Sequence, residues 1–423
     1  MIIKKEAYHN YLLIASVLLI LIPLALISGP FLPDLFIVLI SLIFIFIFNK
    51  KDQLLSLKSN FFRLFLFFYA YLVIVSLLSD NFYDSIKPSI TYVRFGLFSL
   101  AIVFILKNKK DFIKFFYLVM CCTLFVLIFD GYFQFITGKN IFGFKGVRPD
   151  RLGGLFFDEL ILGSYLGKIL PIFCTFYLLN KEYFNKYFIL IFILLIYILV
   201  FLSGERAAFF TTTLYLIMVT PFLIGVRKSV LLFILIGTLF SILIATDKNI
   251  KSRYIDQMLM HTFLKTSNDS TFMPDHIGLF TSAIDIFKKN MFIGGGVKTF
   301  RINCKNTTNE KLMKLKKDIP NMTFCGSHPH NYYLQLLAET GVIGFLFVLS
   351  IFIKLIFNYL KQAYYLIKKN KKTNKEYVTI LSGLIIYIWP LTTTGSLFNN
   401  WICSILFLQI GIYLYVSENV SKN

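Results

Sequence analysis

Long apolar runs, separated by short polar segments, dominate the chain. Each run has roughly 17 to 25 residues, the length that a helix needs to cross a hydrocarbon core about 30 Å thick. Hydropathy therefore predicts an all-α, polytopic membrane helix bundle. The predicted spans, about twelve in number, are residues 11–29, 31–48, 61–78, 90–106, 112–136, 160–179, 184–202, 207–225, 229–246, 332–357, 378–395 and 398–416.

The ends of these runs indicate how the chain is oriented. Lys4 and Lys5 precede the first run as in a signal peptide, but no small-residue cleavage site follows, so we expect a retained helix. Lys and Arg are concentrated in alternate loops, most strongly from Lys361 to Lys375. The positive-inside rule places these loops, and both termini, in the cytoplasm.

One outer segment is long enough to have structure of its own. It divides the chain into a transmembrane bundle at 1–246, a periplasmic loop at 247–331, and the last three spans with the cytoplasmic C-terminus at 332–423. Within the loop, the helical spacing of Phe280, Ile284 and Phe287 predicts an amphipathic helix over 276–290 on the outer membrane surface.

A polar, Lys-rich run from Asn306 to Asn321 follows, and we interpret it as a mobile flap. Cys304 and Cys325 flank this flap. On an oxidising outer face they are expected either to form a disulfide or to remain as two free thiols. Cysteine counting alone does not decide between these states.

Composition supports the membrane assignment and argues against a soluble globular protein and against a nucleic-acid-binding protein. With 57% hydrophobic residues and a mean hydropathy of +0.72, the 423-residue chain has too much apolar surface for a soluble globule. The net charge of +21 is of the size found in nucleic-acid-binding proteins. The basic residues lie between apolar runs, however, so membrane lipids with anionic headgroups are the expected partners, and no nucleic acid is expected.

A short polar loop just before residue 332 carries candidate chemistry. Asn331 is suited to cap a helix that begins at about Tyr332, because Leu334, Leu337 and Ala338 then recur at helical spacing. His330 lies just outside the positive N-terminal end of this helix, which disfavours an imidazolium ion. We therefore expect a neutral imidazole that can accept a proton near pH 7.

Four motifs, in this order, resemble those of the O-antigen ligase and O-antigen polymerase superfamily. They are Arg151-Leu-Gly-Gly-Leu-Phe, Ser203-Gly-Glu-Arg206-Ala-Ala, Phe292-Ile-Gly-Gly-Gly-Val-Lys-Thr-Phe300, and His330-Asn331 followed after nine residues by Gly341 and after two more by Gly344. The resemblance implies a polytopic enzyme that moves a glycan from undecaprenyl diphosphate to an acceptor hydroxyl at the periplasmic face of the bacterial inner membrane. The acceptor would be lipid A core, as in lipopolysaccharide biosynthesis, or another glycan.

Such a transfer needs a base for the hydroxyl proton and cations for the leaving diphosphate. The match to the family histidine makes His330 the expected base, with His328 as its rival and Asn331 in support. Arginine suits the second role because its charge is permanent and its donors form a fixed fork. The expected diphosphate ligands are Arg206, Arg151, Arg148 and Arg253. Glu205 is a supporting residue. The alternatives for Arg206 are a snorkelling anchor at the membrane boundary and an ion pair with Glu205.

Neither a metal nor a cofactor is expected. No cluster of His, Cys, Asp and Glu has metal-ligand spacing, and the outer Asp residues form no Asp-x-Asp pair. Arginines are therefore expected to replace a divalent ion.

Two rival functions remain open. An O-antigen polymerase would use a lipid-linked glycan as the acceptor, and the ligase is favoured over it by the final motif and by the late position of the large loop. A polytopic transporter is a rival from a different class, although ionisable residues within the spans are few, with Lys168 and Lys354 near span ends.

Overall fold

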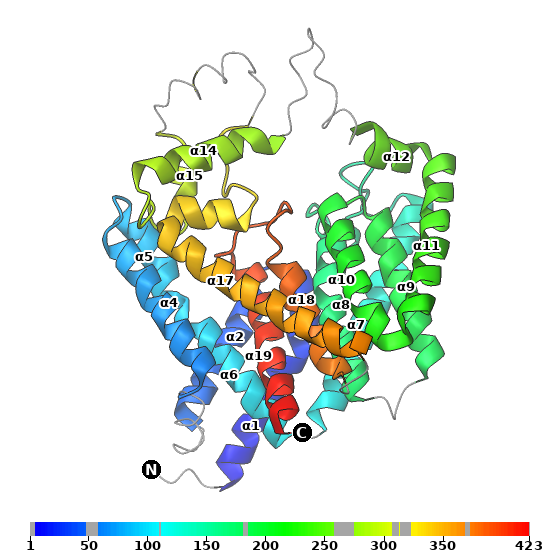
Figure 1. The fold of residues 1–423 in the computed structure, drawn as a ribbon, viewed down its shortest axis with the longest axis horizontal. Helices are drawn as coiled ribbons and strands as arrows, with labels where there is room; N and C mark the ends of the chain where they lie inside the picture. The colour runs from blue at the N-terminus through cyan, green and yellow to red at the C-terminus, as the bar shows by residue number, and fades with distance from the viewer. Residues whose placement is uncertain are drawn as a thin grey trace.

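The computed structural model describes residues 5–47, 58–109, 111–180, 185–257, 275–306, 313, 323–368 and 373–422. Within these ranges the chain is helical and contains no β-strand, apart from an isolated bridge between Lys139 and Lys145 (Figure 1). The polar run predicted as a flap lies almost entirely outside the described residues.

The helices follow the predicted spans closely, because their apolar runs satisfy all backbone hydrogen bonds internally. In the first half they are α1 (Lys5–Ala25), α2 (Phe31–Ile47), α4 (Asn60–Leu77), α5 (Phe82–Thr91), α6 (Val93–Asn108), α7 (Phe112–Thr137), α8 (Leu162–Leu179), α9 (Lys186–Leu202), α10 (Arg206–Ile224) and α11 (Val226–Thr246). The second half has α12 (Lys248–Lys251), α14 (Asp275–Lys289), α15 (Phe300–Asn303), α17 (Tyr332–Lys368), α18 (Lys375–Tyr387) and α19 (Asn400–Lys422).

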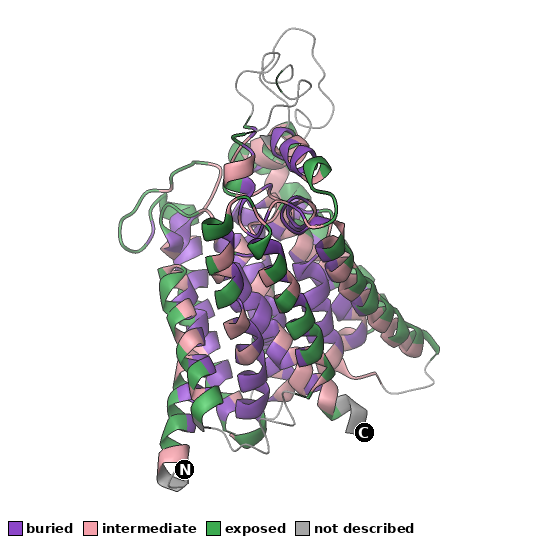
Figure 2. Cartoon of the chain, turned by 90° about the vertical axis from the view of Figure 1, so that its left-hand side faces the viewer, coloured by how far each residue is buried: buried purple, intermediate pink, exposed green. Residues whose placement is uncertain are grey.

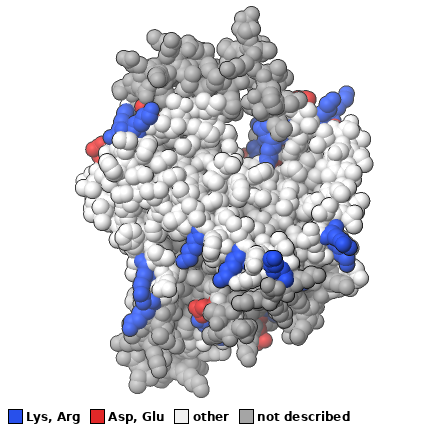
Figure 3. Space-filling view, in the orientation of Figure 1, with Lys and Arg blue, Asp and Glu red and all other residues white. Residues whose placement is uncertain are grey.

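Nine helices of the described chain are long and apolar enough to cross a membrane, and Phe31–Phe46 and Tyr187–Leu202 are shorter apolar helices. Figure 3 shows a broad uncharged band on this face between an upper and a lower set of Lys and Arg side chains. The protein is therefore a multi-pass membrane protein. The number of crossings, predicted as twelve, stays a prediction.

The bundle packs around helices from both ends of the chain. α6 lies against α19, α8 lies against α18, and α1 contacts α2 and α7. Side chains such as Phe98, Leu166 and Ile405 are fully buried between them. Exposed large apolar residues, including Phe67 and Phe357, lie on outward-facing helix surfaces, and Figure 2 shows this split between a buried interior and exposed outer faces. A lipid-facing surface has this character.

The structure corrects two predicted spans. The helix predicted over 332–357 is not continuous, because Gly341 adopts φ 63° and ψ −168° and divides α17 into two helices. The span predicted over 378–395 is too long, because α18 ends at Tyr387. Pro390 disfavours helical backbone at the residue before it, and the chain up to α19 forms a loop instead.

The predicted amphipathic helix forms as α14, but a different face packs against the protein. Leu279, Ala283 and Ile286 are buried with Phe300 and Ala338 of α15 and α17. The predicted apolar face carries Phe280, Ile284 and Phe287, and Ile284 on this face is exposed. The helix therefore packs on the protein through one apolar face, and its second apolar face is partly covered, with Phe280 and Phe287 half-buried. Whether this second face lies on the membrane surface stays a prediction.

Candidate functional site

The loop before α17 is held in place by polar contacts from two directions. The Asn331 side chain accepts hydrogen bonds from the backbone N–H groups of Tyr333 and Leu334, at 3.0 and 3.1 Å, as predicted for a helix cap. Its amide nitrogen donates to the carbonyl oxygen of Pro390 at 2.8 Å. His330 adopts a left-handed backbone conformation, with φ 55°. Contacts with α17 and with the loop at 388–399 therefore hold Asn331 and His330 in place.

Three histidines meet beside this loop. The ring of His330 lies 4.2 Å from that of His328 and 5.0 Å from that of His276, measured between centroids. Burial lowers the pKa of His330 below its usual value, and burial together with the neighbouring His330 lowers the pKa of His328 to about 4. Both imidazoles are thus neutral near pH 7, with burial as the main cause. The neutral state was predicted for His330 alone, from its place at the end of the helix. Sequence reasoning did not include His276.

A buried carboxylate ties the Gly-rich motif to the same helix. Glu339 accepts hydrogen bonds from the backbone N–H groups of Lys298 and Phe300, at 3.0 and 3.1 Å. Gln335 donates to Glu339 at 3.0 Å and to the Ser396 hydroxyl at 2.8 Å. The first part of α17 therefore connects the Gly-rich motif with the loop at 388–399. Neither Gln335 nor Glu339 was predicted, although a carboxylate inside an apolar run is itself a signal.

The break in α17 lets two backbones approach closely. Val342 donates its backbone N–H to the carbonyl oxygen of Met291 at 2.8 Å, and Gly295 donates to that of Ala338 at 2.9 Å. A Cβ atom at Gly341 would lie 2.3 Å from the carbonyl oxygen of Phe292. Only glycine combines this contact with φ 63°, which explains the need for Gly341 in the motif.

The predicted arginine loop between α7 and α8 is held by polar residues of α7. The Asp130 carboxylate accepts the backbone N–H of Ile141 at 2.8 Å, and the Gln134 side chain accepts that of Gly154 at 2.8 Å. Asn140 donates to the carbonyl oxygen of Gly154 at 3.1 Å. These contacts place the loop above α7 and determine where its arginines lie.

Arg148, Arg151 and Arg253 line one cavity of about 640 Å³, together with Asp150. Asp150 forms ion pairs with Arg148 at 2.9 Å and with Arg253 at 3.7 Å. Arg151 donates to the carbonyl oxygen of Leu160 at 2.7 Å, and its Nε atom is buried with no hydrogen-bond partner in the described chain. Lys139 and Lys145 add further positive charge to the wall. The cavity is therefore suited to an anion.

The arginines are close enough to repel one another. Burial, followed by the positive charges of Arg206 and Arg151, lowers the pKa of Arg253 to about 10. Arg253 also donates to the carbonyl oxygen of Gly204 at 2.8 Å. A Cβ atom at Gly204 would lie 2.4 Å from the carbonyl oxygen of Asp150, so glycine allows this close contact. All four predicted arginines are thus close enough for their positive charges to interact. A bound anion would reduce the repulsion between them.

Glu205 does not pair with Arg206, in contrast to the alternative drawn from the sequence. Its carboxylate accepts hydrogen bonds from the backbone N–H of Gly163 at 2.7 Å and from the Ser164 hydroxyl at 2.5 Å. It therefore caps the start of α8. Arg206 begins α10, and within the described chain its guanidinium has neither a hydrogen bond nor an ion pair. This leaves Arg206 available to a ligand.

A small cavity lies between the chain neighbours of Arg206 and groups next to His330. Its walls include Ala207 and Ala208, which follow Arg206, and Tyr332 and Thr394, which lie next to His330. Thr394 donates its backbone N–H to the carbonyl oxygen of His330 at 2.8 Å. Lys168 of α8 also lines this cavity and was predicted only to lie near a span end. The arginine region and the histidine loop therefore lie on the same side of the bundle.

No group of three or more His, Cys, Asp and Glu side chains in the described ranges is arranged to hold a metal ion. The expected metal independence is a separate matter that only a measurement of activity decides.

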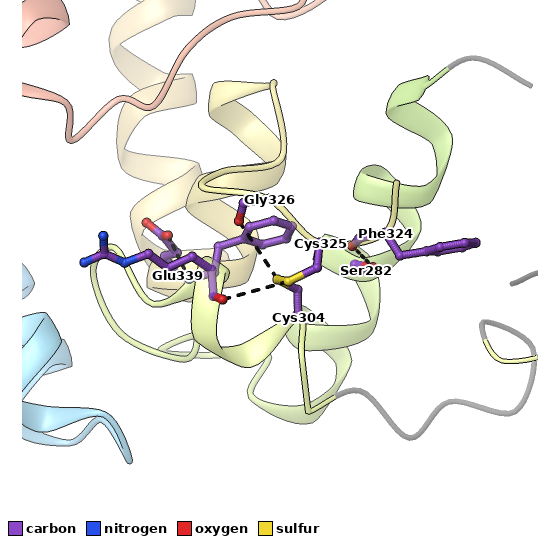
Figure 4. The surroundings of a disulfide bond; sticks show 8 residues. Ser282, Cys304, Phe324, Cys325, Gly326 and Glu339 are labelled. Atoms are coloured by element: carbon purple, nitrogen blue, oxygen red, sulfur yellow. Dashed lines mark hydrogen bonds between the residues drawn. A yellow bond between two sulfur atoms is a disulfide. The ribbon is translucent and has the colours of Figure 1, made fainter. Parts of the chain in front are cut away.

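Cys304 and Cys325 are joined by a disulfide, with their Cα atoms 5.2 Å apart (Figure 4). Beside it, Ser282 of α14 donates to the carbonyl oxygen of Phe324 at 2.7 Å. These links attach the segment before His328 to α14 and α15. The disulfide therefore fixes the start of the loop that carries His328 and His330.

Comparison with known proteins identifies this region. Residues 190–349 match the family model described as O-antigen ligase, and the match includes Arg206, Arg253, the Gly-rich motif and His330. Arg148 and Arg151 precede it. No curated protein matches the chain. The match covers less than half of the chain, and it supports membership of the O-antigen ligase superfamily and, in general, a membrane glycosyltransferase of the ligase or polymerase type.

Proposed function

We propose that the protein is an O-antigen ligase that transfers a glycan from undecaprenyl diphosphate to a hydroxyl group of lipid A core. Family membership supports a lipid-linked glycan substrate in general. The observation that supports a shared site is the small cavity whose walls include the chain neighbours of Arg206 and groups next to His330. In this proposal the Arg206 guanidinium and the His330 imidazole act on one substrate near this cavity.

In this proposal the arginines bind the diphosphate. Arg206 has no partner of its own in the described chain, and Arg148, Arg151 and Arg253 line the neighbouring cavity. Guanidinium groups form charge-assisted hydrogen bonds with phosphate oxygens. They also stabilise the negative charge that grows on the leaving oxygen. Asp150 then acts by orienting Arg148 and Arg253.

His330 is the proposed base. Its lowered pKa keeps the imidazole neutral near pH 7, so it can take the proton from the acceptor hydroxyl. The new bond forms between that oxygen and the anomeric carbon of the sugar. The bond from this carbon to the phosphate oxygen breaks, and its electron pair leaves with undecaprenyl diphosphate. Arginines supply the positive charge, so the proposed reaction needs no divalent metal.

The proposed location is the inner membrane, with both termini in the cytoplasm and the site on the periplasmic side. This orientation follows from the distribution of Lys and Arg between the apolar runs. The proposed division is a bundle at 1–246, a periplasmic loop at 247–331, and the final spans at 332–423. A lipid-linked donor would then reach the arginines from the membrane boundary.

The test uses the purified full-length chain with a lipid-linked glycan donor and two acceptors. Transfer to lipid A core supports the ligase, whereas transfer only to a second lipid-linked glycan identifies a polymerase. His330→Ala and Arg206→Met should each reduce transfer by at least about 100-fold. If no transfer occurs to any acceptor, or if either variant is fully active, the proposal is wrong. Activity lost with EDTA and restored by magnesium would contradict metal independence.

A further inference from the structure

The small cavity between the two halves of the site is lined by groups that the proposed mechanism does not use. Its volume is about 40 Å³, and since a single water needs about 10–15 Å³, it has room for a few polar atoms. Ser164, Lys168, Thr211, Tyr332 and Thr394 contribute to its wall. The wall contains no carboxylate side chain. The hydroxyl groups of Ser164 and Thr211 already donate to Glu205 and to backbone carbonyl oxygens, so Lys168, Tyr332 and Thr394 are the groups with donors to spare.

Lys168 is the charged group of this wall. Its ammonium lies 5.6 Å from the centre of the Tyr387 ring, and it forms no ion pair within the described chain. Glu205 attracts it from beyond ion-pair distance, but that carboxylate is already bound by the start of α8. Lys168 is partly buried, and an ammonium held among helices without a paired counter-ion is stabilised when an anion reaches it.

Two hydroxyl groups of the wall are also unsatisfied. The side-chain oxygen atoms of Tyr332 and Thr394 are buried and have no hydrogen-bond partner in the described chain. Tyr332 is only 2% exposed. A buried hydroxyl without a partner loses the hydrogen bonds that it makes with water. A wall that holds one ammonium and two such hydroxyl groups is complementary to an oxyanion.

We propose that this cavity is an oxyanion subsite, in which Lys168 and Thr394 bind the phosphate that is attached to the transferred sugar. This inference rests on the proposed function. The cavity lies between the start of α10 at Arg206 and the loop of His330, so it is next to both the diphosphate ligands and the base. The arginines hold the diphosphate as a whole. Lys168 stabilises the oxygen that receives the electron pair when the sugar–oxygen bond breaks.

The test measures the affinity of the chain, in lipid nanodiscs, for two sugar-free probes. The probes are farnesyl diphosphate and farnesyl phosphate. Lys168→Met retains the length of the side chain and removes its charge. It should weaken the binding of the diphosphate by about 10- to 100-fold, the range expected for a hydrogen bond to a charged group. Binding of the monophosphate should change by less than about 3-fold, because this probe lacks the second phosphate.

Thermal stability separates a binding role from a structural role. Because Lys168 has no ion-pair partner, Lys168→Met should melt at or above the temperature of the wild type. Thr394→Val removes a hydroxyl without a partner, so it should also weaken diphosphate binding with little change in the melting temperature. Tyr333→Phe is the matched control. Its hydroxyl donates to the carbonyl oxygen of Ile388, so it should melt lower and bind both probes as the wild type does.

Arg206→Met distinguishes this inference from the proposed function. If Arg206→Met loses both probes while Lys168→Met binds the diphosphate normally, the subsite is wrong and the proposed function stands. If neither variant loses affinity, both proposals fail. A Lys168→Met protein that melts well below the wild type, or that loses the two probes equally, also overturns the subsite.

Discussion

The backbone N–H of Thr394 donates a 2.8 Å hydrogen bond to the carbonyl oxygen of His330. This bond joins the loop before α17 to the loop that follows α18. It supports His330 in its left-handed conformation, which most residues other than glycine avoid. The placement of the candidate base therefore depends on a segment far away in the sequence.

His330 and His328 should differ sharply in their effect on transfer. His330→Ala removes the proposed base, and we expect the rate to fall by about 10²- to 10⁴-fold with little change in melting temperature. His328→Ala should retain most of the activity. The measurement is initial rates of glycan transfer by purified variants of matched melting temperature. A reversed order would move the role of base to His328.

Acid should destabilise the protein through His328. Its pKa is about 4 in the folded chain, compared with an ordinary value near 6.5. Above about pH 6.5 both states are neutral at this residue, so it contributes no pH dependence. Between pH 6.5 and about 4 the unfolded chain binds a proton that the folded chain does not, and stability falls as the pH falls. Melting temperatures over this window should be less pH-dependent in His328→Asn, and equal slopes would refute the assignment.

Glu339 should be essential for stability although it lies away from the proposed chemistry. Glu339→Ala leaves the backbone N–H groups of Lys298 and Phe300 and the amide of Gln335 without their acceptor. At about 1–3 kcal/mol for each unsatisfied group, the free energy of unfolding should fall by about 3 kcal/mol or more. Glu339→Gln retains one acceptor oxygen and should be intermediate. Denaturation in detergent measures this order, and an alanine variant as stable as the wild type would contradict it.

Gly341→Ala should be strongly destabilising. The new Cβ atom would lie 2.3 Å from the carbonyl oxygen of Phe292, and alanine does not readily adopt φ 63°. Together these effects should cost about 2–4 kcal/mol. Gly237→Ala in α11 is the matched control, since its Cβ atom would meet nothing within 4 Å. It should be neutral or slightly stabilising. The measurement is the melting temperature of both variants. Equal shifts in melting temperature would show that the close contact at Gly341 is not required.

The disulfide between Cys304 and Cys325 predicts a specific alkylation pattern. Cys121, Cys122, Cys174 and Cys403 are free, so unfolded protein without reductant should gain four alkyl groups, and six after reduction. A double substitution to serine should lower stability by about 3 kcal/mol, because the link closes a loop with a sequence separation of 21. Six alkyl groups without reductant would mean that the thiols are free.

The proposed site was only partly accessible from the sequence. Asn331 as a helix cap follows from local backbone geometry and was predicted correctly. The lowered pKa of His330 agrees with the predicted neutral imidazole, but its main cause is burial and not the end of the helix. Motif resemblance selected the four arginines. It did not indicate that Asp150 pairs with Arg148 and Arg253 or that Glu205 binds the start of α8. Arg253 and Gly163 are far in the sequence from Asp150 and Glu205, so these contacts form only when the helices pack.

Hydropathy and local capping determined where the helices of this protein form, because each apolar helix satisfies its own backbone within a short stretch of sequence. The tertiary structure alone decided that α17 breaks at Gly341, where it meets the backbone of Phe292, and that Lys168 lines the same cavity as Thr394. Each of these features depends on contacts between segments that are distant in the chain. Such contacts form only when the helices pack, and the sequence pattern of a single segment does not contain them.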